Sequence, residues 1–60
     1  MSKEELHACA IGEIERTAEK LQHEPEGGFR YYLKGELTGL VNAYYHAGAI
    51  SIVERNKYKA

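Results

Sequence analysis

The feature that most constrains the fold of this chain is a single interruption, residues 24–28 (EPEGG), between two long stretches with helical periodicity. Proline disfavours helical geometry at the residue before it, and glycine relieves strain in a turn. Gly48 supplies the next stop, because glycine readily takes the left-handed conformation that ends many helices. The sequence therefore predicts two long helices joined by a short connection, which form an antiparallel helical hairpin.

The first predicted helix spans about residues 3–23. Ser2 and Glu5 form a capping box, in which each side chain accepts a hydrogen bond from the backbone amide of the other residue. At about 100° per residue, one side of the helix is apolar and the other is charged, so the apolar side has to pack against a second element. The residues on that side are Leu6, His7, Ala10, Ile11, Ile14, Ala18 and Leu21.

The second predicted helix spans about residues 29–47. Its apolar side chains recur at spacings of three and four residues, which is the helical period. They are Phe29, Leu33, Leu37, Leu40 and Tyr44. One side of this helix is therefore expected to face the first helix.

A short third helix is predicted over about residues 52–58, because Ser51 and Glu54 repeat the capping-box spacing. The alternative for residues 49–53 is a short strand, since their β-branched content is high. We favour the helix, because a lone strand would have no partner elsewhere in the chain. The apolar residues expected to cover one end of the hairpin are Ile50, Ile52, Val53 and Tyr58.

A chain of 60 residues is short for a domain that folds alone. Such a chain buries only about 60% of the surface that its unfolded form exposes, and the lone Cys9 excludes an internal disulfide. Two amphipathic helices bury only the strip along which they contact each other. The edges of both apolar stripes stay exposed to solvent unless a third element or a second copy covers them. We therefore expect one helical domain over residues 1–60, completed by two-fold dimerisation into a helical bundle.

Charge is divided unevenly along the chain. Residues 1–28 carry seven glutamates and three cations, and residues 29–60 carry five cations and two glutamates, for a net charge of −1. A dedicated nucleic-acid-binding protein would have a clearer positive excess. No apolar run approaches the roughly 18 residues of a membrane span, and a single cysteine without a secretory signal fits a reducing compartment, so we expect a soluble cytoplasmic protein.

Small residues recur at every fourth position of the second predicted helix. They are Gly35, Gly39, Ala43 and Ala47. Because a glycine inside a helix costs about 1 kcal/mol relative to alanine, two in one helix call for a reason. Close approach of a second backbone is such a reason, either from the first helix at Ala8 and Gly12 or from a second copy. The alternative is that the chain simply tolerates these glycines.

Aromatic side chains gather at both ends of the second predicted helix. Tyr31 and Tyr45 share a side, being about four turns apart, and tyrosine favours interfaces because it buries a large ring while its hydroxyl stays hydrogen-bonded. The predicted partner-binding residues on this side are Tyr31, Gly35, Thr38, Asn42, Tyr45 and His46. The alternative is that Tyr32 and Tyr44 belong to the core and that the other two tyrosines cover the dimer seam.

One charged residue, Glu36, falls within the apolar stripe of the second predicted helix. A buried carboxylate would need a partner such as His7, but glutamate is rarely fully buried, and we expect Glu36 to lie at the edge of the stripe and reach water.

No metal, cofactor or catalytic site is predicted. The residues with suitable ligand atoms are His7, Cys9, His23 and His46, and they lack the spacing of a zinc motif. Cys9 also has no base that the sequence reveals, so it gives no basis for a reactive thiolate.

These features predict a protein-binding module without enzymatic activity. We expect an inhibitor, adaptor or modulator of a larger protein, of the kind that bacteria, phages and mobile elements encode at this size. The alternative is a nucleic-acid-binding helical dimer, although its low charge argues against it because phosphate neutralisation supplies most of such affinity. Its contacts would come from Arg30, Lys34, Arg55, Lys57 and Lys59.

Overall fold

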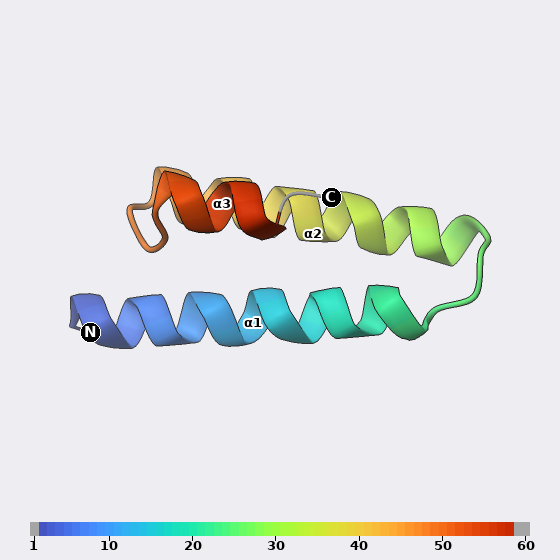
Figure 1. Ribbon diagram of the computed structural model, residues 1–60, viewed down its shortest axis with the longest axis horizontal. Helices are drawn as coiled ribbons and strands as arrows, with labels where there is room; N and C mark the ends of the chain where they lie inside the picture. Colours follow the sequence, from blue (N-terminus) through green and yellow to red (C-terminus); the bar gives the residue numbers. More distant parts are fainter. Residues whose placement is uncertain (1, 59–60) are drawn as a thin grey trace.

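Three helices make up the computed structural model, which describes residues 2–58 (Figure 1). Helices α1 (Lys3–His23) and α2 (Gly28–His46) run antiparallel, and α3 (Ile52–Tyr58) folds back along the C-terminal half of α2. The first turn of α1 lies at the same end of the molecule as the connection between α2 and α3. The prediction of an all-helical hairpin followed by a short third helix is confirmed.

The ends of the helices follow their capping residues. The Ser2 hydroxyl accepts a bond from the Glu5 amide at 3.1 Å, and the Glu5 carboxylate accepts one from the Ser2 amide at 3.2 Å, so the predicted capping box is confirmed. Helix α2 begins one residue earlier than predicted and ends one residue earlier, at His46. Gly48 has φ +77°, the left-handed conformation predicted for it, and turns the chain back toward α3.

The segment between α2 and α3 contains no strand, nor does any other part of residues 2–58. Ala49 and Ile50 are buried in the core, and Ser51 caps the short helix. The Ser51 hydroxyl accepts the Glu54 amide at 3.1 Å, which gives α3 the same capping box as α1. The helix prediction for residues 52–58 is confirmed, and the strand alternative is wrong.

The core is a narrow seam between α1 and α2, closed at one end by the segment after α2. Its buried members are Ala10, Ile14, Leu37, Val41, Ala49 and Ile50. The sequence interpretation omitted Val41, which is fully buried, and placed Phe29 on the packed side, where it is instead half exposed. Thr17 is also buried, and its hydroxyl donates to the Glu13 carbonyl at 3.0 Å, so the helix satisfies its own polar group.

Helix α3 covers the hairpin in a different way from the one predicted. Ile50 is buried as expected, but Ile52 is 45% exposed and Val53 is 73% exposed, and α3 itself has no buried residue. The half-buried side chains are instead polar or amphipathic, namely Glu54, Arg55 and Tyr58. The expectation that Ile52 and Val53 cover the hairpin is therefore wrong, because Glu54, Arg55 and Tyr58 make the contacts with the hairpin and lie on the other side of this short helix; Tyr58 packs against the core as expected.

The turn between α1 and α2 is closed by a side chain. One nitrogen of Arg30 donates to the Leu21 carbonyl at 3.1 Å and to the Glu24 carbonyl at 2.9 Å. The last carbonyls of a helix have no partner within it, so Arg30 satisfies the end of α1 from the first turn of α2. Both long helices are thus joined at this end.

Replacing Ile14 tests whether the narrow seam holds the fold. Ile14→Ala removes a fully buried side chain from the middle of α1 and should lower the free energy of unfolding by about 2–4 kcal/mol. Val53→Ala, on the exposed side of α3, is the control and should change it by less than about 0.5 kcal/mol. Urea unfolding followed by circular dichroism measures both, and equal effects would contradict this description of the core.

Candidate functional site

The small residues of α2 form a ridge on the outside of the hairpin. We call Gly35, Gly39, Ala43 and Ala47 the small-residue ridge; all four are exposed. A Cβ added to either glycine would meet no atom within 4 Å. The predicted contact with Ala8 and Gly12 of α1 is therefore wrong, because α2 packs on α1 through the opposite side. Contact with a second copy stays a prediction.

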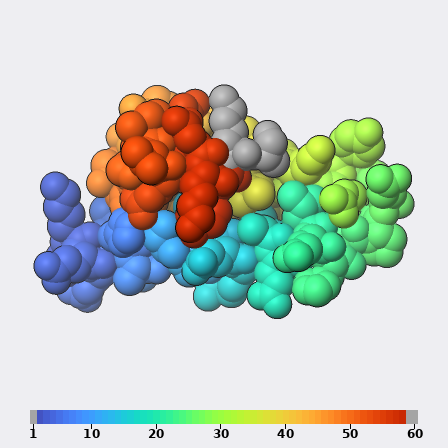
Figure 2. Space-filling model, viewed as in Figure 1, coloured from blue at the N-terminus to red at the C-terminus, as the bar shows by residue number. Residues whose placement is uncertain are grey.

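The predicted tyrosine surface is present, but α3 covers half of it. We call Tyr31, Thr38, Asn42 and Tyr45 the tyrosine face. Tyr31 is 77% exposed and Thr38 is half-buried, whereas Arg55 of α3 contacts the other two residues. Its Nε donates to the Asn42 side-chain oxygen at 2.9 Å, and its guanidinium lies 5.3 Å from the centre of the Tyr45 ring. Figure 2 shows α3 lying over the C-terminal half of α2, while the start of α2 remains uncovered.

The other two predicted partner-binding residues lie beside the tyrosine face. Gly35 and His46 are both exposed, and the His46 ring is 5.3 Å from that of Tyr45. The structure thus leaves Tyr31, Gly35 and His46 accessible, while Asn42 and Tyr45 are engaged.

Two further aromatic side chains, Phe29 and Tyr32, lie at the start of α2. The rings of Phe29 and Tyr32 are 5.8 Å apart, and these side chains are 51% and 66% exposed. The alternative that placed Tyr32 in the core is wrong, because Tyr32 lies about 140° around the helix from the buried Leu37. With Tyr31, these residues give α2 an exposed aromatic end.

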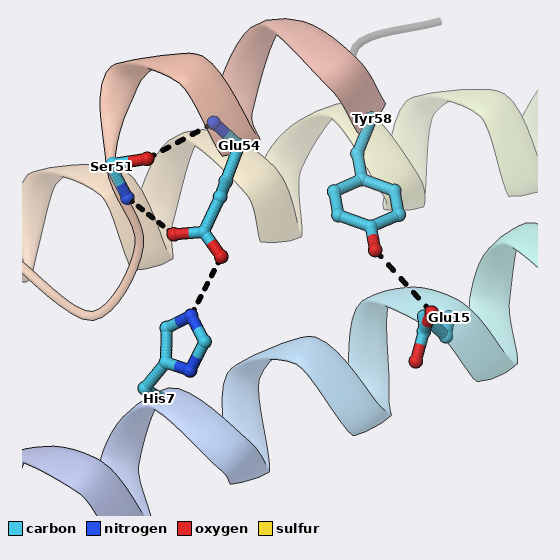
Figure 3. Close-up of polar contacts among 5 residues, drawn as sticks. All are labelled: His7, Glu15, Ser51, Glu54 and Tyr58. Carbon is cyan, nitrogen blue, oxygen red and sulfur yellow. Dashed lines mark hydrogen bonds and ion pairs between the residues drawn. The ribbon is translucent and has the colours of Figure 1, made fainter.

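The contact between α3 and α1 centres on one carboxylate, Glu54 (Figure 3). It accepts the Ser51 amide at 2.9 Å through one oxygen and lies 2.6 Å from Nε2 of His7 through the other. The hydrogen bond from the Ser51 backbone, followed by the one from His7, lowers the pKa of Glu54 below its ordinary value. The same group therefore caps α3 and ties it to α1.

His7 consequently has a different partner from the one considered in the sequence. Glu36 lies exposed on α2, as expected for a residue at the edge of the apolar stripe, and His7 contacts Glu54. This pair was missed because the two residues lie 47 positions apart, and only the turn at Gly48 brings them together.

Ser51, Glu54 and His7 are residue types that hydrolases also use, but they are arranged in another order. In a nucleophilic triad the imidazole lies between the hydroxyl and the carboxylate, so that it can take the hydroxyl proton. Here the carboxylate lies in the middle, the imidazole bonds to it, and the Ser51 hydroxyl accepts the Glu54 amide. The arrangement caps and ties helices; it does not activate Ser51.

The far end of α3 is tied to α1 by a weaker contact. The Tyr58 hydroxyl donates to a Glu15 carboxylate oxygen at 3.4 Å (Figure 3). Lys57 places its ammonium 5.2 Å from the centre of the same ring. Polar contacts at Glu54, Arg55 and Tyr58 therefore hold α3, and the Tyr58 ring also packs against the core cluster.

A hydrogen bond that the sequence interpretation did not include joins the two long helices. The Tyr44 hydroxyl donates to the Glu13 carboxylate from a half-buried position. This bond, and then burial, raises the pKa of Tyr44 above that of an ordinary tyrosine. Residues 31 positions apart could not be paired before the register of the hairpin was known.

Four of the basic residues proposed as nucleic-acid contacts lie within the described range, and these four do not gather on one open surface. Arg30 is engaged with carbonyls at the end of α1, and Arg55 with Asn42 and Tyr45. Lys34 and Lys57 are exposed on different helices, and Lys59 lies outside the described residues. No observation favours the nucleic-acid alternative over protein binding.

Comparison of the chain with protein-family models, with curated proteins and with solved structures finds no match. Within residues 2–58, no three histidine, cysteine or acidic side chains come together as metal ligands do. No helix in that range combines the length and the apolar character needed to cross a bilayer.

Tyr44→Phe should lower the free energy of unfolding by about 1 kcal/mol at neutral pH, because it removes the bond to Glu13. The folded chain holds the Tyr44 proton more tightly than the unfolded chain, so this stabilisation is complete below the ordinary tyrosine pKa of about 10 and is lost as pH rises above it. Urea unfolding at neutral and alkaline pH measures the difference. Tyr31→Phe is the control, and an equal loss in both variants would contradict the assignment.

Proposed function

We propose that this chain is a small helical protein-binding module that forms a homodimer and inhibits, links or modulates a larger protein. The observation that carries the proposal is the exposed aromatic end of α2 beside the open small-residue ridge. Phe29, Tyr31 and Tyr32 all stand at least half exposed on a regular helix, within about two turns of Gly35.

Exposed aromatic rings on a rigid helix suit a binding surface. Aromatic side chains supply much of the energy of protein interfaces, because a large ring is desolvated and a tyrosine keeps its hydroxyl available for a hydrogen bond. Tyr31 and Tyr32 point about 100° apart around the same turn. Scattered single apolar residues are normal on a surface, but the exposed, adjacent rings of Phe29 and Tyr32, with Tyr31 exposed on the same turn, are better explained by a partner.

The positions of small residues on α2 support a second copy bound antiparallel across the ridge. Gly35 and Ala43 lie four residues to either side of Gly39, and Tyr32 and His46 lie seven to either side. A two-fold axis at Gly39 would therefore place Gly35 of one copy against Ala43 of the other, and Tyr32 against His46. Such self-complementary spacing is what an isologous dimer requires, and small residues allow the two backbones to approach closely.

Variants at Gly39 separate stability from self-association. Gly39→Ala should raise the free energy of unfolding of the dilute chain by about 0.5–1 kcal/mol, since the added methyl meets no atom and alanine favours the helix. Gly39→Leu should stay folded and weaken dimerisation at least about tenfold by obstructing the close contact. Sedimentation equilibrium over a range of concentrations measures the dimer.

Gly12→Leu is the matched control, because Gly12 is also a mid-helix glycine with no atom near an added Cβ. It should leave dimerisation unchanged. A monomer at every concentration for the original chain, or equal effects of the two leucine variants, would exclude the ridge as the dimer contact.

Photo-crosslinking from the aromatic end tests binding to a larger protein. A benzophenone amino acid in place of Tyr31 should yield, in the cells of origin, an adduct heavier than two copies of the chain. The same amino acid in place of Glu19, on the exposed side of α1, is the control and should not yield it. Tyr31→Ala combined with Tyr32→Ala should lower recovery of that partner at least about tenfold. Equal adducts from both positions would contradict the proposed surface.

A further inference from the structure

Helix α3 has its polar side turned inward. It buries no residue, yet Glu54, Arg55 and Tyr58 contact the hairpin, and Ile52 and Val53 face solvent. A helix that contributed to the core would place its apolar side chains the other way round. The Tyr58 ring packs against the edge of the core cluster, but the other contacts that hold α3, from Glu54 and Arg55, are of the kind that are weak at a surface and readily exchanged for others.

The segment before α3 is held much more firmly. Ala49 and Ile50 are 4% and 5% exposed and belong to the core cluster, whereas Ser51 is exposed. Movement of α3 about Ser51 would take Tyr58 away from the edge of the core but leave all its buried members in place. The capping bonds between Ser51 and Glu54 lie on the α3 side of that point, so they would move with the helix.

The surface beneath α3 is chemically matched to a cation. The Asn42 side-chain oxygen accepts the Arg55 Nε–H, and the Tyr45 ring receives the same guanidinium at 5.3 Å. An amide oxygen beside an aromatic face is a small site for an arginine or lysine side chain. Both residues belong to the tyrosine face, whose open end is Tyr31.

We propose that α3 is a displaceable cover of the tyrosine face, and that the partner which displaces it presents an arginine or lysine to Asn42 and Tyr45. The α1–α2 hairpin stays folded while α3 moves away about Ser51. Only the identity of the displacing molecule as a protein rests on the proposed function. The opening itself is a property of the isolated chain.

Charged groups that contact α3 outside the tyrosine face can be replaced to weaken the attachment of α3 to the hairpin. Glu54 faces His7 of α1, and Lys3 and Glu4 line the same open hollow. Tyr58 faces Glu15 of α1 at the other end of α3. His7 does not belong to the tyrosine face, so its replacement can release α3 without altering the cation site.

The test compares His7→Ala with His23→Ala, another exposed histidine of α1, in the full chain. Amide hydrogen exchange by NMR should show that amides of residues 55–58 in the original chain exchange at least about 100-fold faster than those of Ile14 and Val41. His7→Ala should speed the exchange of residues 55–58 about two- to fivefold, as expected for one exposed ion pair. His23→Ala should not. Core amides should keep their rates in both variants.

A second measurement distinguishes release of α3 from fraying of its end. Tyrosine nitration, read by mass spectrometry as the ratio of Tyr45 to Tyr31, should rise about two- to fivefold in His7→Ala and stay constant in His23→Ala. A constant ratio in both, or exchange of α3 amides only at the rate of the core, would overturn the displaceable cover.

A peptide of residues 51–58, added to the Arg55→Ala chain, tests whether the site prefers a cation. A peptide concentration of about 1 mM is suitable, because segments joined by a short flexible linker meet each other at an effective concentration in that range. The peptide should shift the NMR signals of Asn42 and Tyr45. The same peptide with glutamine at the arginine position should not. Equal shifts with both peptides, or none with either, would show that the site does not select a basic side chain. These experiments need no partner, so their failure is distinct from failure of the crosslinking experiment.

Discussion

The seam between α1 and α2 is the constraint on which the rest of the molecule depends. Ile14 and Val41 are the largest side chains that are fully buried, and few others have comparable cover. A chain of this size forms one narrow core along the length of its hairpin, and the rest of each helix meets solvent or a neighbour. The side of α2 that packs against α1 therefore determines which of its other side chains form the exposed surfaces. The small-residue ridge faces outward, and the tyrosine face lies along one flank.

That geometry explains why α3 is attached as it is. The seam takes Ala49 and Ile50, and of the residues that follow only Tyr58 packs against its edge. Glu54 and Arg55 contact polar groups and a ring of the two long helices. The result is a helix fixed at its start by burial and along its length by hydrogen bonds and a cation beside an aromatic ring. A hairpin with such an attachment has two distinct surfaces, one open at Tyr31 and one beneath α3.

The fold could be predicted because helix ends depend on residues close together in the sequence. The candidate site could not, because its contacts join residues that are far apart in the sequence. Helix ends followed Ser2, Pro25, Gly48 and Ser51, whose effects act within a few residues, and the helix periods were read directly. Contacts between distant positions were beyond such reasoning. His7 with Glu54 and Tyr44 with Glu13 depend on the register of the hairpin and on the direction in which Gly48 turns the chain.

The errors share a physical cause. The glycines of α2 were predicted to mark a close backbone contact, but their spacing could not tell whether α1 or solvent lay opposite them. For α3, a seven-residue segment shows less than two full turns of periodicity, so the sequence could not tell which of its sides faces the hairpin, and long-range contacts of Glu54 and Arg55 lie on that side. Ile52 and Val53 thus appeared to be core residues by type and are surface residues by position.

The Arg30 bonds at the turn have a consequence for the mechanics of the molecule. They join the two long helices at one end of a body 38 Å long, whereas surface contacts of α3 close the opposite end. The two ends of the molecule are therefore closed in different ways. At the Pro25 end a single side chain is shared by both long helices, and at the Ser51 end a short helix lies on top of a buried segment, Ala49 and Ile50. Movement of α3 would thus change the surface at one end and leave the joint at the other end unchanged.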